Sequence, residues 1–150
     1  MQPWVISAIG GAFGIAVHYL FLRAAAGRIN DTLGALVLEL TAAVGIALAY
    51  ALGLRGGPSI APTHLGIAFA ALSGLGISAA SILLFAALRR GGPVAATGTI
   101  VLGGGVVISA LVAPLLFGDV WTPRRAIGVA LGIAAMIVLS VDGSHGAEVK

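Results

Sequence analysis

Cysteine is absent from this 150-residue sequence, and only 9% of its residues are charged, whereas soluble domains have about 25%. Without cysteine, the chain has neither a disulfide framework nor a thiolate metal site. The residue patterns typical of zinc proteases, serine hydrolases and phosphate-binding loops are missing as well. We therefore predict no catalytic residues, no metal site, no cofactor and no enzyme activity.

Long apolar runs fill the sequence instead, and hydrophobic residues make up 59% of it. A bilayer core is about 30 Å thick, so a helix that rises 1.5 Å per residue crosses it with about 20 apolar residues. The runs predict an all-α membrane protein, a bundle of five transmembrane helices in one domain at residues 1–141. The predicted helices are 4–22, 32–54, 65–88, 93–117 and 123–141, followed by a polar tail at 142–150.

Basic residues lie mainly at the edges of these runs. The net charge of +3 therefore indicates contact with lipid phosphates and no affinity for nucleic acid. Five predicted crossings place the termini on opposite sides. One side holds Arg23, Arg28, Arg89, Arg90 and Lys150, and the other holds Arg55, Arg124 and Arg125. The positive-inside rule then favours an outer N-terminus and an inner C-terminus in a cell inner (plasma) membrane. A difference of five basic residues against three is also compatible with insertion in both orientations.

Small residues recur at four-residue spacing in several runs, where they let membrane helices approach closely. A run of three glycines in the fourth helix also predicts tight packing or a deformable point. The glycines predicted to pack helices together are Gly10, Gly14, Gly74, Gly103, Gly104, Gly105, Gly128 and Gly132.

Glu39 lies eight residues into the second run, about 12 Å deep by helical rise. A charge at the bilayer centre costs about 2.5–3.5 kcal/mol, so such an acid is expected to face protein or water. It is either a carboxyl that couples protons or binds a cationic solute, or a structural clasp between helices. His18 lies at a comparable depth from the same surface, so the two side chains could pair; the other interpretation, which His18 taken alone favours, is an interfacial histidine bonded to a backbone carbonyl.

Hydroxyl groups in the third and fourth runs are candidates for lining a polar cavity, although such hydroxyls often bond their own helix. The two tyrosines near helix ends, Tyr19 and Tyr50, are interpreted chiefly as interface anchors. The candidate cavity residues are Ser73, Ser78, Ser81, Thr97, Thr99 and Ser109, together with Tyr50.

Three stretches in the second half of the chain, at 85–96, 113–119 and 122–133, resemble the EamA-like family of the drug/metabolite transporter superfamily. Most members have Glu where this chain has Asp119. Members usually contain two five-helix repeats of opposite orientation, and this chain has one. The resemblance implies half of a drug/metabolite transporter-type fold, which would transport as a homodimer, parallel or antiparallel. Small four-helix relatives carry their membrane Glu in the first helix, so no residue role is transferred to Glu39.

The leading functional prediction is therefore a small transporter that moves a small metabolite or a cationic solute by alternating access, with Glu39 and His18 in its polar site. The alternative is a non-transporting membrane subunit that packs against a partner protein and stabilises it. The sequence leaves amino acids, cationic drugs, nucleosides and metal ions open as substrates.

Overall fold

Helices make up almost all of the described chain. The computed structural model describes residues 3–54 and 61–145. Five of the described helical spans are long and apolar enough to cross a bilayer, as predicted, and the chain is a multi-pass membrane protein. The elements are α1 (Pro3–Ala25), α2 (Asp31–Ala51), α3 (His64–Arg89), α4 (Val94–Gly98), the π-helical segment η1 (Thr99–Gly103), α5 (Gly104–Phe117) and α6 (Pro123–His145).

The helix boundaries differ from the predicted ones by three residues or more at three C-terminal ends, and the fourth helix contains an irregular segment. α1 continues to Ala25, three residues beyond its predicted end. α2 ends at Ala51, three residues early, and α6 continues to His145, so the first four residues of the predicted tail are helical. The predicted fourth helix is one span, Val94–Phe117, but it contains η1, which begins after its first five residues. Arg55 and Lys150, which entered the charge comparison, lie outside the described residues.

Polar and glycine residues end the helices by identifiable contacts. The side chain of Asn30 accepts hydrogen bonds from the backbone N–H groups of Thr32 (3.0 Å) and Leu33 (3.3 Å). Two otherwise unpaired donors at the start of α2 are thereby satisfied. At the end of α5, Gly118 adopts a left-handed conformation with φ of +67°, which glycine reaches without strain.

The chain divides into two units. One contains residues 1–24 and 87–150 and is called the α1/α4–α6 unit here; the other contains residues 25–86 and is called the α2–α3 unit.

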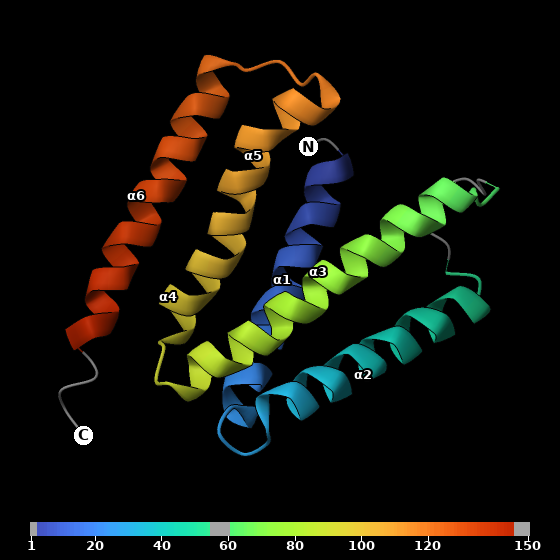
Figure 1. Cartoon of the computed structure of the whole chain (residues 1–150), viewed down its shortest axis with the longest axis horizontal. Coiled ribbons are helices and arrows are strands. Elements are labelled where there is room, and N and C mark those ends of the chain that lie inside the picture. The colour runs from blue at the N-terminus through green and yellow to red at the C-terminus, as the bar shows by residue number, and fades with distance from the viewer. Residues whose placement is uncertain (1–2, 55–60, 146–150) are drawn as a thin grey trace. The chain divides into compact units, whose positions relative to one another are not determined.

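In the α1/α4–α6 unit, α5 and α6 run antiparallel and lie side by side (Figure 1). A Cβ atom on Gly132 of α6 would lie 3.5 Å from Cγ2 of Val107 on α5. Gly103 and Gly104 face Met136 in the same way, at 3.6 and 3.7 Å from its nearest atoms. These three glycines therefore lie where the two helices meet.

In the α2–α3 unit, α2 and α3 are antiparallel neighbours (Figure 1). Ala35, Leu84 and Phe85 are buried at the end of this helix pair where α2 begins. Gly34 leaves room for the Phe85 ring, since a Cβ atom there would lie 2.8 Å from Cζ of Phe85. This contact sets the register of the two helices and thereby the pairing deeper in the membrane.

Candidate functional site

Glu39 of α2 contacts Ser81 of α3 inside the predicted membrane span. The Ser81 hydroxyl donates a hydrogen bond to Oε1 of Glu39, with an oxygen–oxygen distance of 2.7 Å. Ser81 is buried and Glu39 is half-buried. Each residue lies eight positions from its helix end, Asp31 in α2 and Arg89 in α3, so antiparallel packing brings them to the same depth.

This pairing identifies Ser81 among the hydroxyls weighed from the sequence. Ser78 instead donates to the Gly74 carbonyl of its own helix at 3.0 Å, and Ser109 donates to the Val106 carbonyl at 3.0 Å. In bonds of this kind the hydroxyl proton is donated to a carbonyl of the same helix, so it is not available for a solute. The equal offset of Glu39 and Ser81 from their helix ends was the signal in the sequence that could have singled out this pair.

The remaining candidate cavity residues have different surroundings in their own units. Thr97 is buried near the α3–α4 turn, with its hydroxyl beside Gly92. Ser73 is exposed on α3, and Tyr50 is exposed near the end of α2. Thr99 borders a groove between α1 and the α4–η1 segment.

His18 is half-buried in α1 and packs edge-on against the ring of Tyr19, with ring centroids 5.4 Å apart. It belongs to the α1/α4–α6 unit, whereas Glu39 belongs to the α2–α3 unit. The pairing of His18 with Glu39 stays a prediction.

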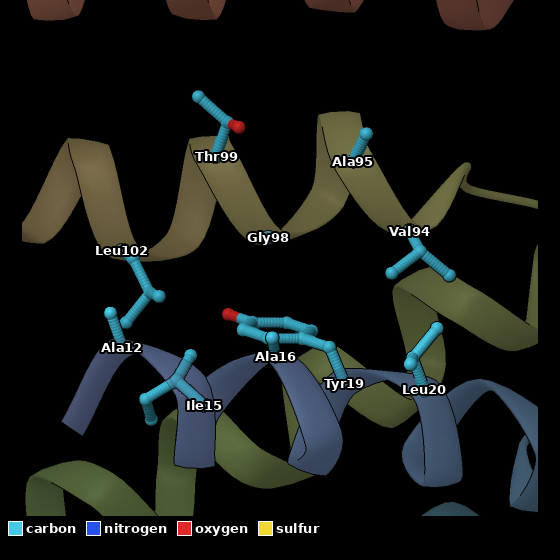
Figure 2. Close-up of a pocket in the computed structure, with 10 residues that line it drawn as sticks. All are labelled: Ala12, Ile15, Ala16, Tyr19, Leu20, Val94, Ala95, Gly98, Thr99 and Leu102. Atoms are coloured by element: carbon cyan, nitrogen blue, oxygen red, sulfur yellow. The ribbon is translucent and has the colours of Figure 1, made fainter. Parts of the chain in front are cut away.

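Tyr19 lies against α4, and its predicted role as an interface anchor is wrong. Its side chain is only 7% exposed. A Cβ atom on Gly98 would lie 3.3 Å from the nearest ring carbons, so the absence of a side chain at Gly98 makes room for the ring. Figure 2 shows the ring lying flat beneath Gly98, between α1 and the fourth span. A tyrosine near a helix end can thus be taken for an anchor when it is a packing residue.

The Tyr19 ring borders a groove of about 570 Å³ between α1 and the α4–η1 segment. Apart from the two hydroxyl-bearing residues Tyr19 and Thr99, its lining residues are aliphatic or glycine, and none is charged. The groove was not predicted from the sequence. Its lining residues, all labelled in Figure 2, are Ala12, Ile15, Ala16, Tyr19, Leu20, Val94, Ala95, Gly98, Thr99 and Leu102.

The π-helical segment η1 begins directly after Gly98, and Thr99 and Leu102 of this segment line the groove. π-Helical turns are rare and often occur at functional sites. The backbone irregularity lies beside the glycine run 103–105, where the sequence predicted a deformable point or tight packing.

Other glycines predicted to pack helices have open surroundings. A Cβ atom on Gly10, Gly14, Gly74, Gly105 or Gly128 would meet no atom within 4 Å in the described part of the chain. The helix surface at these glycines therefore makes no close contact there, in contrast to the surface at Gly103, Gly104 and Gly132.

No group of three or more His, Asp or Glu side chains that could hold a metal ion occurs within residues 3–54 and 61–141. The chemistry available in the two sites is accordingly that of a carboxyl, hydroxyls and apolar surface.

Comparisons with known proteins give no relative: no family model, no curated protein and no solved structure matches the chain. The resemblance to the EamA-like family therefore rests on the sequence motifs at 85–96, 113–119 and 122–133 alone.

Proposed function

We propose that this protein is a small membrane transporter that moves a small metabolite or a cationic solute by alternating access, as a homodimer and coupled to protons. The observation that carries the proposal is the contact between Glu39 and Ser81 within the membrane span. An ionisable side chain at this depth is costly to insert, and such residues typically belong to proton relays and substrate pathways.

The hydrogen bond supports a coupling role in a specific way. A hydroxyl can donate to a carboxylate and can also accept from a protonated carboxyl, so Ser81 stabilises Glu39 in both charge states. A carboxyl that has a partner in both states can gain and lose a proton without losing that contact.

The irregular fourth span supports alternating access. Transporters commonly contain interrupted helices near the membrane midplane, beside which substrates bind. η1 is a milder irregularity, a π-helical turn five residues into the unbroken span Val94–Phe117, and such turns often occur at functional sites. The homodimer follows from the family resemblance, because a single five-helix repeat corresponds to half of the usual transporter.

The alternative function is a non-transporting subunit that stabilises a partner. It is favoured by the exposure of the spans, since no more than 11% of an 18-residue apolar stretch in any described span is buried within the chain. Surface of this kind is covered by lipid or by another membrane protein, and the free glycine faces of Gly10 and Gly14 would suit close helix contact.

Reconstituted protein tests the proposal. Proteoliposomes that enclose a pH-sensitive dye are exposed to a panel of amino acids, nucleosides and cationic drugs. The proposal expects at least one solute to change the internal pH with saturable kinetics, in excess of empty liposomes. If no solute on a broad panel does so, and a tagged chain instead co-purifies in fixed stoichiometry with one membrane protein that is degraded in its absence, the subunit function is correct.

A further inference from the structure

Tyr19 carries a buried hydroxyl for which the described residues supply no hydrogen-bond partner. Its side chain is more than nine-tenths buried, yet its hydroxyl makes no hydrogen bond to any residue of the described chain. No fully buried side-chain nitrogen or oxygen is unpartnered in that part of the chain, so the Tyr19 hydroxyl must reach the groove it lines. Figure 2 shows the oxygen directed along the groove toward the side of Leu102.

The depth of the Tyr19 hydroxyl in the membrane limits the kinds of ligand that can reach it. Tyr19 lies six residues from the end of α1 at Ala25, about 9 Å by helical rise. Side chains of long residues lean toward the N-terminus of their helix, which carries the phenol oxygen farther from that membrane surface. The oxygen therefore lies in the hydrocarbon layer, below the ester groups of the lipids. An unpaired hydroxyl in such a medium is unfavourable and is available to a ligand.

The groove has the size and chemistry of a ligand site. Its volume of about 570 Å³ is within the range of small-molecule pockets, which are about 300–1,000 Å³. Small residues on facing helices, namely Ala12 and Ala16 on α1 and Gly98 on α4, leave this space open. No charged side chain lines it, so a charged ligand would lose its hydration without compensation.

We infer that this groove binds an uncharged lipophilic molecule that carries a hydrogen-bond acceptor such as a carbonyl oxygen, to which the Tyr19 hydroxyl donates. The inference adds a separate binding site to the protein and does not depend on the proposed function, whose polar site contains Glu39 and not this groove. A lipid acyl chain or a helix of a second copy fits the apolar walls as well, but an acyl chain offers no acceptor at this depth.

Benzophenone is a suitable probe, because it is uncharged and apolar, has one carbonyl acceptor, and on irradiation inserts into nearby C–H bonds. The full-length protein in lipid nanodiscs is irradiated with benzophenone, and the adducts are mapped by peptide mass spectrometry. We expect saturable labelling concentrated on α1 around Ala12–Leu20 and on Val94–Leu102. Tyr19→Phe should raise the benzophenone concentration that gives half-maximal labelling about threefold to tenfold, the usual effect of one lost hydrogen bond.

Two control variants make the result specific. Tyr50→Phe makes the same chemical change outside the groove and should leave labelling unchanged. Ala12→Phe fills the groove and should abolish the saturable labelling while leaving Tyr19 in place. Tetraphenylphosphonium, a lipophilic cation, should not compete.

Labelling spread evenly over lipid-facing helices would mean that lipid or a second copy fills the groove, and the inference would be wrong. Groove labelling that Tyr19→Phe leaves unchanged would equally overturn the role of the hydroxyl. If labelling depends on Tyr19 but the protein shows no flux, the binding site is supported and the transport function is refuted. If the protein shows flux but no such labelling, the transport function is supported and this binding site is refuted.

Discussion

At the scale of single residues, Glu39 and Ser81 show which parts of the candidate site can be predicted from the sequence. An acid eight residues into an apolar helix is conspicuous because of its insertion cost, so Glu39 is identifiable from sequence. Its partner Ser81 can be found by counting, because both residues lie eight positions from the ends of two antiparallel helices that meet at the same membrane surface. Tyr19 has no such signal, because its position against Gly98 depends on how α1 and α4 pack. The sequence consequently predicted an anchor.

Replacing Ser81 by alanine should destabilise the protein, because the Glu39 carboxyl loses the donor at 2.7 Å. We expect a loss of about 0.6–2 kcal/mol, the range for such bonds within membranes and for a newly unpaired group. Unfolding in mixed micelles with increasing SDS measures it. Ser140→Ala is the control, since Ser140 bonds only the Ile137 carbonyl of its own helix. Equal losses in the two variants would show that the Glu39 contact contributes no stability of its own.

Gly34→Ala should destabilise the α2–α3 unit, because the new Cβ would lie 2.8 and 2.9 Å from two atoms of the Phe85 ring. Phe85 is only 2% exposed and has little room to move. Overpacking of this kind costs about 1–3 kcal/mol, measured by the same SDS titration.

Gly45→Ala, in the same helix, is the matched control for Gly34→Ala. A Cβ atom there meets nothing within 4 Å, so this substitution should be neutral or stabilising by up to about 1 kcal/mol. A Gly34→Ala protein as stable as Gly45→Ala would refute the close packing of Phe85 on α2.

At the scale of elements, the sequence predicts helix number and length well, because each apolar run gives one helix and the thickness of the bilayer sets its length. It predicts the packed faces poorly. In a soluble helix an apolar stripe marks the buried face, but a membrane helix is apolar on every side. The glycine rows at Gly10–Gly14 and Gly128–Gly132 therefore look alike in sequence, although only Gly132 among them has a close neighbour on another helix within the described chain. The sequence likewise does not predict the π-helical segment η1, apart from the glycine run that overlaps its end.

The contact between α5 and α6 predicts an efficient cross-link. The chain lacks cysteine, so a Val107→Cys/Gly132→Cys double variant has only the two introduced thiols. With a Cβ at Gly132 placed 3.5 Å from Cγ2 of Val107, oxidation should join them at high yield, and a protease cut in the α5–α6 connection should leave the fragments linked. Ile108→Cys/Gly132→Cys, shifted by one exposed residue, is the control. Equal yields in both pairs would contradict the orientation of α5.

At the scale of the whole molecule, five crossings require the α3–α4 turn and the α5–α6 connection to lie on opposite sides of the membrane. Single-cysteine variants at Arg90 and at Val120 test this arrangement with a membrane-impermeant maleimide. We expect Val120→Cys to be labelled in intact cells and Arg90→Cys only after permeabilisation, as the charge distribution predicts. Labelling of both positions in intact cells would contradict a single orientation and would support insertion in both.

Proton coupling through Glu39 is the central claim for the whole transporter. Its most direct test is solute uptake into proteoliposomes with and without an imposed pH gradient, compared among the wild type, Glu39→Gln and Asp119→Asn. Asp119→Asn makes the corresponding acid-to-amide change at an exposed ion pair with Arg125, which contributes at most about 1 kcal/mol. The account predicts that the gradient accelerates uptake in the wild type and in Asp119→Asn and has no effect in Glu39→Gln. Uptake by a well-folded Glu39→Gln protein that still responds fully to the gradient would contradict it.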